Sequence, residues 1–503
     1  MNRINTHPFL PVLLLTALAL SSCSGKNTTV VPPGGSNGTV AATMVADTLP
    51  ANPSLLSFQV TIASITFTPA SGTATTVTLN PALTVDLMRL QSDTVFLGTF
   101  ANIPAAQYSS VTLSLSGNAN ITFLNDTNAT LSMCPANTVC PLSVAASSNP
   151  VATVSFTVSQ NAVTGIGIDL NFANAVSISS GNLVVDFTKS NVLSAFTLPR
   201  ANSNLASGQL DLIEDFTGVV SLNTNSVTIA SSTRGTLIAT ATANAILDAD
   251  PSRTLCVNPT QGQVSSCVSN NQVASMDVVL KSDGTLSIQE IEPLLATAQD
   301  TVEGTVSSIN STSVTQFGII VTDKPSTLAS SSLIGGLNVG DTLTVNIPSA
   351  KPFLVDTKGL LVSPGSLTFF ANQFNNTALH PGQTVAVHVA SFTAANGTTP
   401  ASANADTVIL RWSRFTATPI NASTNNILNV TALPSYFNFG SSSQFVVQLF
   451  SGAQGTGGVT NFDGIASGTS VNNSRPVSLR ALFIENPGNT ANPAFFAAKV
   501  RQH

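Results

Sequence analysis

Four cysteines in the body of the chain fall into two close pairs, and thiols at short spacing can form disulfides or bind metal. Cys134 and Cys140 flank a Pro-Ala-Asn-Thr-Val segment, and Cys256 and Cys267 enclose a second polar loop. Zinc ligand pairs are usually separated by about two to four residues and are often completed by histidine. Neither pair has this spacing, and no histidine lies near them in the sequence. We therefore predict two loop-closing disulfides, which indicate an oxidising compartment.

Few other side chains could act as catalysts or ligands. Apart from His7 and the last residue, only His380 and His388 could serve as bases or metal ligands, and their spacing matches no metal motif. His388 lies in an alternating apolar segment, which favours a structural role. The sequence also has no phosphate-binding glycine loop. We predict no catalytic residues, no metal ligands and no cofactor, and therefore a protein that is not an enzyme.

Carboxylates form two local groups. Asp211, Glu214 and Asp215 precede a predicted strand, and Asp248 and Asp250 lie in a predicted loop. Oxygen-rich groups of this kind can bind calcium. Neither group has the ligand spacing of a known calcium-binding loop, so we assign no metal to them. Two acids for glycoside hydrolysis can lie far apart in a sequence, and that alternative stays open.

The N-terminus has the order of residue types found in an export signal. Arg3 precedes an apolar run from Phe9 to Leu20. This run is too short for a membrane-spanning helix, which needs about 20 apolar residues. The segment Leu20-Ser21-Ser22-Cys23 follows, and it resembles the lipobox of bacterial lipoproteins. The resemblance implies cleavage after residue 22 and a lipid anchor on Cys23. Because Ser24 is not an aspartate, it also implies anchoring in the outer membrane, on a periplasmic or a surface face.

The composition limits the class of partner. Only 8% of residues are charged, against about 25% in an average soluble protein, so Ser, Thr, Asn and Gln must cover much of the surface. The net charge of −6 comes with no basic stretch, which excludes nucleic acid, because phosphate neutralisation dominates that affinity. The partners that we expect are the membrane, through the lipid on Cys23, and envelope proteins or glycans.

From about Val40 onward, short segments alternate apolar residues with Thr or Ser, as in Val111, Leu113 and Leu115. Period-two alternation with Gly, Asn and Pro breaks is typical of short β-strands. We predict an all-β chain with an N-terminal β-sandwich followed by two to three small β-barrel-like modules. The predicted divisions are a signal peptide (1–22), the lipidated cysteine with a flexible tether (23–40), the sandwich (41–206), a first module (207–297), a second module (298–414) and a degenerate third module (415–503).

Four elements of the first 200 residues carry a more specific pattern. They are a strand with Val60, Ile62, Ile65 and Phe67, the segment Val85–Leu90, the segment Ile103–Tyr108 that leads into a strand, and Asp169–Phe172. This order resembles an uncharacterised bacterial domain family that occurs at the N-terminus of envelope lipoproteins. The resemblance implies a fold and a location but no reaction. We interpret Tyr108 as a buried tyrosine with a bonded hydroxyl and not as a recognition residue.

Weak repeats follow. The segments Phe216–Val220, Val302–Val306 and Phe415–Thr418 each open a unit that continues with an Asn/Ser-rich turn and another strand, a plan similar to small β-barrel modules repeated in bacterial envelope proteins. We favour a non-enzymatic envelope scaffold or interaction surface. The alternative is a glycan-binding or adhesive module with exposed aromatics such as Trp412, Tyr436 or Phe437. An enzyme, our third hypothesis, requires a cleft where two carboxylates or His388 converge.

Overall fold

The computed structural model of the chain describes residues 36–47, 54–126, 130–248, 255–256, 259–260, 262–294, 300–325, 332–347, 353–362, 375–397, 399–437, 444–452, 458–484 and 494–502. Within these ranges the elements are almost all β-strands, which confirms the predicted all-β class. The short helical segments are α1 (Phe172–Ala175), η1 (Arg89–Gln91), η2 (Val264–Ser266), η4 (Asn376–Ala378), η5 (Ser435–Phe437) and η6 (Gly468–Ser470). In this part of the chain no helix has the length and apolar character needed to cross a membrane. The predicted signal peptide and Cys23 lie outside the described residues.

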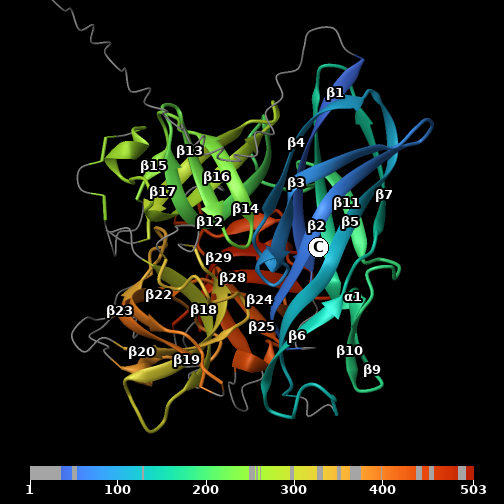
Figure 1. The fold of residues 1–503 in the computed structure, drawn as a ribbon. Coiled ribbons are helices and arrows are strands. Elements are labelled where there is room, and N and C mark those ends of the chain that lie inside the picture. The colour runs from blue at the N-terminus through green and yellow to red at the C-terminus, as the bar shows by residue number, and fades with distance from the viewer. Residues whose placement is uncertain are drawn as a thin grey trace, which may run out of the picture.

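The N-terminal part is a β-sandwich (Figure 1). One sheet contains, in spatial order, β11 (Leu193–Leu198), β8 (Val163–Asn171), β1 (Asn37–Asp47) and β4 (Val95–Pro104). The other contains β3 (Thr75–Asp86), β2 (Leu55–Pro69), β5 (Ala106–Leu124) and β6 (Val139–Ala145), and β7 (Val151–Val158) also pairs with β5. A separate hairpin consists of β9 (Val176–Ser179) and β10 (Asn182–Val185). Strand β1 begins at Asn37, so it includes the last residues that we predicted as tether.

Alternation of apolar and polar residues explains why these strands form a sandwich. Along β7, every second side chain is buried, and Val154 and Phe156 belong to one core that both sheets share. The same period places Phe58 and Val60 of β2 in this core and turns Gln59 outward. Tyr108 is also buried there, and its hydroxyl donates a hydrogen bond to the carbonyl of Pro104 at 2.9 Å. The interpretation of Tyr108 as a structural residue agrees with this geometry.

Three six-stranded sheets follow, and all three have the same strand order. The first contains β12 (Gln209–Leu222), β13 (Ser226–Ser231), β14 (Gly235–Thr240), β15 (Ile246–Leu247), β16 (Val273–Lys281) and β17 (Leu286–Pro293). The second contains β18 (Thr301–Ile309), β19 (Gln316–Asp323), β20 (Thr342–Asn346), β21 (Leu354–Val355), β22 (Thr384–Thr393) and β23 (Ala401–Arg411). The third contains β24 (Ser413–Pro419), β25 (Ile427–Thr431), β26 (Phe445–Gln448), β27 (Asn461–Asp463), β28 (Val477–Phe483) and β29 (Phe495–Arg501).

Each sheet closes into a small barrel because its third strand pairs in parallel with its last strand. The closing pairs are β14 with β17, β20 with β23, and β26 with β29. In each barrel a further short strand, β15, β21 or β27, runs parallel to the same last strand. We call these units the first, second and third barrels. They agree with the predicted β-barrel-like modules of the fold class.

The barrels and the sandwich meet at the centre of the molecule. In Figure 1 the blue to green strands of the sandwich lie beside the barrels, and the red strands β24, β28 and β29 of the third barrel lie between the sandwich and the other two barrels. Ala41 of β1 belongs to the core of the first barrel, and Phe96 of β4 packs against that core. The short helical segment η1 of the sandwich contacts β24 of the third barrel. The centre of the molecule is therefore a junction of four units.

Candidate functional site

Six buried side chains at the junction form a closed ring of alternating charge, which we call the ion ring. Its members in order are Arg89, Glu303, Arg411, Asp215, Arg414 and Asp93, and Asp93 pairs again with Arg89. Every unit contributes to it. The sandwich provides Arg89 and Asp93 at η1, the first barrel Asp215 on β12, the second barrel Glu303 on β18 and Arg411 on β23, and the third barrel Arg414 on β24.

Two of the ring arginines each bridge two carboxylates at short distance. A guanidinium nitrogen of Arg89 lies 2.9 Å from a carboxylate oxygen of Glu303, and another lies 3.3 Å from Asp93. Arg411 lies 3.3 Å from Glu303 and 2.8 Å from Asp215. Guanidinium groups have several donors in a fixed plane, so one arginine can bind two carboxylates at the same time.

Arg414 completes the ring and contacts all three of its carboxylates. Its Nε lies 2.7 Å from Asp93, its Nη2 pairs with Asp215, and its Nη1 lies 3.5 Å from Glu303. The ring side chains are at most 7% exposed. Charges buried this deeply must be paired, because removing one partner leaves the other without solvation.

The arginines determine the ionisation of the ring carboxylates. Burial raises the pKa of Asp93, but Arg414, Arg234 and Arg89 outweigh that effect and lower the pKa to about 2. Burial likewise opposes ionisation of Asp215, yet Arg411 and Arg414 hold its pKa well below the usual value. The carboxylates are therefore charged at neutral pH, and each acts as a fixed counter-ion for the guanidinium groups around it.

A second chain of ion pairs extends from the ring into the third barrel. Arg480 of β28 lies 3.6 Å from Asp93 and 2.8 Å from Glu214 of β12. Lys499 of β29 lies 2.7 Å from the other oxygen of Glu214. Despite burial, Arg480 and Lys499 lower the pKa of Glu214 to about 2. The third barrel provides cations on β28 and β29, whereas the first barrel provides carboxylates on the corresponding pair β16 and β17, where Asp277 is the Cα partner of Glu290.

The C-terminal end of the chain is held by the same junction. Arg501 is fully buried, and its Nε lies 2.6 Å from Asp463. Its Nη1 donates hydrogen bonds to the carbonyls of Leu90, Gln91 and Asp93 at 3.0 to 3.1 Å. The last strand of the third barrel thus binds the η1 segment of the sandwich, although Arg501 and Leu90 are 411 positions apart.

The carboxylate group that we considered for calcium has another role. Glu214 and Asp215 bind arginine and lysine side chains, and Asp211 accepts a hydrogen bond from the hydroxyl of Thr43 at 2.7 Å. Protein donors therefore bind oxygens of all three carboxylates. Asp248 accepts hydrogen bonds from the backbone of Leu255 and Cys256. Asp250 lies outside the described residues.

The two internal histidines lie apart from the junction carboxylates. His388 of β22 is 3% exposed, and its Nδ1 lies 3.3 Å from Asp406 of β23, so it supports a strand pair. The ring of His380 packs against that of Phe483 in a tilted arrangement with centres 5.5 Å apart, and burial lowers the pKa of His380. Among the described residues, no group of three or more His, Cys, Asp or Glu has an arrangement that could hold a metal ion.

The two cysteine pairs form the predicted disulfides. Cys134 is bonded to Cys140, with Cα atoms 5.7 Å apart, and Cys256 is bonded to Cys267, with Cα atoms 4.8 Å apart. The first disulfide closes a loop that leads into β6 of the sandwich, and the second closes a loop before β16 of the first barrel.

A polar cleft of about 810 Å³ adjoins the junction, between the sandwich and the first two barrels. Its floor is the outer face of the β2–β5–β6 sheet. Gln59 and Asn120 are Cα partners across β2 and β5, and Asn120 and Ser143 are partners across β5 and β6. The three side chains therefore form one row across the sheet.

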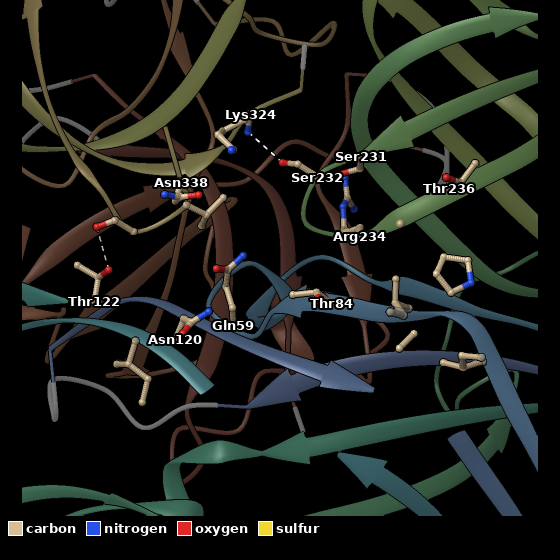
Figure 2. A pocket seen from close by; sticks show the side chains of 18 of the residues that line it. Gln59, Thr84, Asn120, Thr122, Ser231, Ser232, Arg234, Thr236, Lys324 and Asn338 are labelled. Atoms are coloured by element: carbon tan, nitrogen blue, oxygen red, sulfur yellow. Dashed lines mark hydrogen bonds between the residues drawn. The ribbon is translucent and has the colours of Figure 1, made fainter. Parts of the chain in front are cut away.

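The roof of the cleft comes from the two barrels (Figure 2). The first barrel contributes Ser232 in the β13–β14 turn, and the second contributes Lys324 and Asn338 before β20. Hydrogen bonds fix the roof in place. Thr122 of the floor donates to the carbonyl of Gly340 at 2.9 Å, and Ser232 donates to the carboxylate of Asp323 at 2.6 Å. The cleft is connected to the junction by Arg234, which lines it and lies 3.6 Å from Asp93.

The aromatic residues that we considered for glycan recognition are not an exposed platform. Trp412 is fully buried in the core of the second barrel, where it joins side chains such as Leu482 from the third. Phe437 is 1% exposed, and the half-buried Tyr436 stacks on it with ring centres 5.0 Å apart. The exposure that the alternative hypothesis requires is wrong for these residues, because Trp412 packs where the second and third barrels meet and Phe437 belongs to the core of the third barrel. In the described part of the chain, the large exposed apolar side chains are all aliphatic or Met.

Sequence reasoning did not find the ion ring. Directly paired members are separated by as many as 321 positions, and scattered single arginines carry no local pattern. One signal was available: each barrel has an aspartate at or directly after its short parallel strand, namely Asp248, Asp356 and Asp463. Of these, Asp356 pairs with Arg411 and Asp463 with Arg501, so this recurrent aspartate leads from two barrels to the junction.

Comparison with known proteins assigns one part of the chain. Residues 43–191 match a domain of unknown function (DUF4382). The N-terminal region therefore contains this uncharacterised domain, in agreement with the resemblance noted for Val85–Leu90, Ile103–Tyr108 and Asp169–Phe172. No curated protein and no solved structure matches the chain.

Proposed function

We propose that this chain is a lipid-anchored, non-enzymatic scaffold of the bacterial outer membrane. In this proposal Cys23 carries the anchor after removal of the signal peptide, the residues up to β1 are the tether, and the sandwich and barrels form one rigid body that interacts with envelope partners. The lipobox resemblance of Leu20–Cys23 and the two disulfides support an exported, anchored protein.

The observation that carries the scaffold role is the ion ring. Three arginines and three carboxylates of a sequence this poor in charge are committed to one another at the centre. Asp215, for example, pairs with both Arg411 and Arg414 and is fully buried. The ring side chains orient the four units relative to one another, and burial shields them from any substrate. This arrangement suits a structural role better than proton transfer to a substrate.

The three barrels support the same proposal. Their identical strand order, their parallel closing strands and the recurrent aspartate of the short strand suggest copies of one module that diverged in charge. Divergence of this kind would give each barrel a different set of charges for the junction, carboxylates in the first and cations in the third. A row of related modules is a common way to build an extended interaction surface.

The anchor is tested by protease shaving of intact cells that express wild type, Cys23→Ala or the neighbouring control Ser24→Ala, together with labelled palmitate. We expect wild type and Ser24→Ala to take up the label and stay with the cells, and Cys23→Ala to lose the label and appear in the medium or as soluble periplasmic protein. Digestion of the wild type would indicate the surface face, and protection the periplasmic face. Label or membrane retention in Cys23→Ala at the wild-type level would contradict the proposal.

A further inference from the structure

We propose that the cleft between the sandwich and the first two barrels binds an uncharged polyhydroxylated ligand, a segment of an oligosaccharide. This inference goes beyond the scaffold role and does not depend on the anchor. The volume of the cleft, about 810 Å³, is within the range of small-molecule sites, which is about 300 to 1,000 Å³. Three units line the cleft, so a ligand bound in it would contact all of them.

The first argument is the set of side-chain amides that face the cleft. Within the described part of the chain, the amides of Gln59, Asn120 and Asn338 make no hydrogen bond to the protein. Figure 2 shows Gln59 and Asn120 on the sheet that forms the floor and Asn338 on the opposite side. An amide both donates and accepts hydrogen bonds, and so does a sugar hydroxyl. Unused amides on both sides of a cleft are therefore suited to a hydroxyl-rich ligand.

The second argument is that the charges at the cleft are already used by the protein. Arg234 donates to the backbone carbonyls of Glu214 and Asp215, and its guanidinium lies 4.6 Å from the ring centre of Phe216. The ammonium of Lys324 donates to the carbonyl of Leu337. The third charged group of the lining, the carboxylate of Asp341, accepts a hydrogen bond from the backbone N–H of Asn338 at 2.7 Å. Each charged group at the cleft thus has a protein partner, so the amides and hydroxyls determine the specificity.

The third argument is shape. The roof is joined to the floor by the hydrogen bond from Thr122 to Gly340, and the turn that carries Ser232 is fixed to Asp323. A site whose walls are fixed before binding loses less conformational entropy when a ligand enters. At the other end of the cleft, Pro81, Leu83 and the half-buried ring of Phe96 provide apolar surface for the C–H faces of a sugar.

The test is binding of neutral tetrasaccharides of glucose, mannose, galactose and N-acetylglucosamine to the purified full chain in a detergent without a sugar headgroup. Calorimetry and ligand-observed NMR would be used up to about 10 mM sugar, where complexes with millimolar Kd are detected. We expect at least one tetrasaccharide to bind, and the double variant Gln59→Ala with Asn120→Ala to weaken its affinity at least about tenfold. Because both side chains lie on the outer face of the sheet, the variant is expected to keep the wild-type melting temperature.

The matched control is Gln107→Ala. Gln107 is an exposed amide on the same strand, β5, but it bonds to Ser155 and Thr157 and does not line the cleft. This variant should bind the sugar as wild type does. The proposal is overturned if no tetrasaccharide binds, if the control loses affinity as much as the double variant does, or if the cleft variants change binding of an unstructured neutral peptide pool and not of sugars. Cys23→Ala protein must give the same affinities, which separates this test from that of the anchor.

Discussion

At the scale of single residues, the ion ring places three arginines and three carboxylates in the interior of a chain in which only 8% of residues are charged. The low charge content correctly predicted a surface rich in Ser, Thr, Asn and Gln, and the outer face of the β2–β5–β6 sheet is an example. The positions of the arginines could not be predicted, because the ring members come from four units that only the fold brings together. Arg89 and Glu303 are separated by 214 positions, and nothing local to either residue indicates the other. The sequence identified Asp211, Glu214 and Asp215 as a group of carboxylates that could bind calcium. Their cationic partners could not be assigned without the fold.

Arg89 is the residue whose removal should expose the role of the ring most directly. It lies 2.9 Å from Glu303 and 3.0 Å from Asp323, and both carboxylates are buried. Arg89→Ala leaves them without this counter-ion, and removal of one partner of a buried pair costs about 3 to 5 kcal/mol. We expect a loss of this size in the free energy of unfolding, measured by urea denaturation.

The control for that experiment is Lys189→Ala. Lys189 is exposed in the same domain, and its ammonium lies 3.5 Å from the hydroxyl of Ser177. Its removal should change the free energy of unfolding by less than about 0.5 kcal/mol. Equal effects of the two substitutions would show that the ring does not stabilise the junction.

At the scale of elements, the sequence predicted most of the architecture. Alternation of apolar and polar residues identifies strands because one face of each sheet packs on a core, as along β7. It does not identify which strands pair, because every strand here has a similar pattern of Val, Thr and Ser. The parallel pairing of β1 with β8 and the parallel closure of each barrel join segments that are distant in sequence. The cleft depends on that assembly, so its residues, such as Gln59 and Asn338, carried no signal in the sequence.

The opening strand of the first barrel contains a glycine that the packing requires. A Cβ atom on Gly218 of β12 would lie 2.2 Å from the carbonyl oxygen of Ala230 on β13. Gly218→Ala should therefore push the two strands apart and lower the free energy of unfolding by about 1 to 3 kcal/mol, the usual cost of overpacking.

The comparison variant is Gly336→Ala, where an added Cβ would meet no atom within 4 Å. Thermal unfolding followed by circular dichroism should show a lower Tm for Gly218→Ala and a Tm close to wild type for Gly336→Ala. A wild-type Tm for both would mean that β12 and β13 separate at no cost, contrary to the barrel described here.

At the scale of the whole molecule, the ion ring predicts that the four units are held together at neutral pH and released by acid. The pKa values of Asp93 and Glu214 are lowered to about 2, and those of Asp215, Glu303 and Asp463 are also lowered, by their cationic partners and against the effect of burial. A carboxylate with a lowered pKa in the folded state contributes stability above its unfolded pKa of about 4 and loses it as the pH falls toward 2.

The pKa values of two buried carboxylates are shifted in the opposite direction. Burial raises the pKa values of Asp86 and Asp211, so these groups favour the folded state more when protonated. They oppose the acid effect, but they are fewer than the five paired carboxylates and do not belong to the ring. The net expectation is a loss of stability between about pH 4 and pH 2.

The measurement that tests the ion ring most directly is an acid titration followed by two signals at once. The chain has a single tryptophan, Trp412, which is fully buried and whose carbonyl accepts a hydrogen bond from Arg414 of the ring at 2.9 Å, so its emission reports on the junction. Far-ultraviolet circular dichroism reports on the strands of all four units. We predict that both signals are constant from neutral pH to about pH 4 and then change together as the pH approaches 2, and that Arg89→Ala moves this transition to higher pH. Constant signals down to pH 2, or an Arg89→Ala transition at the wild-type pH, would contradict the conclusion that the buried ion ring holds the four units together.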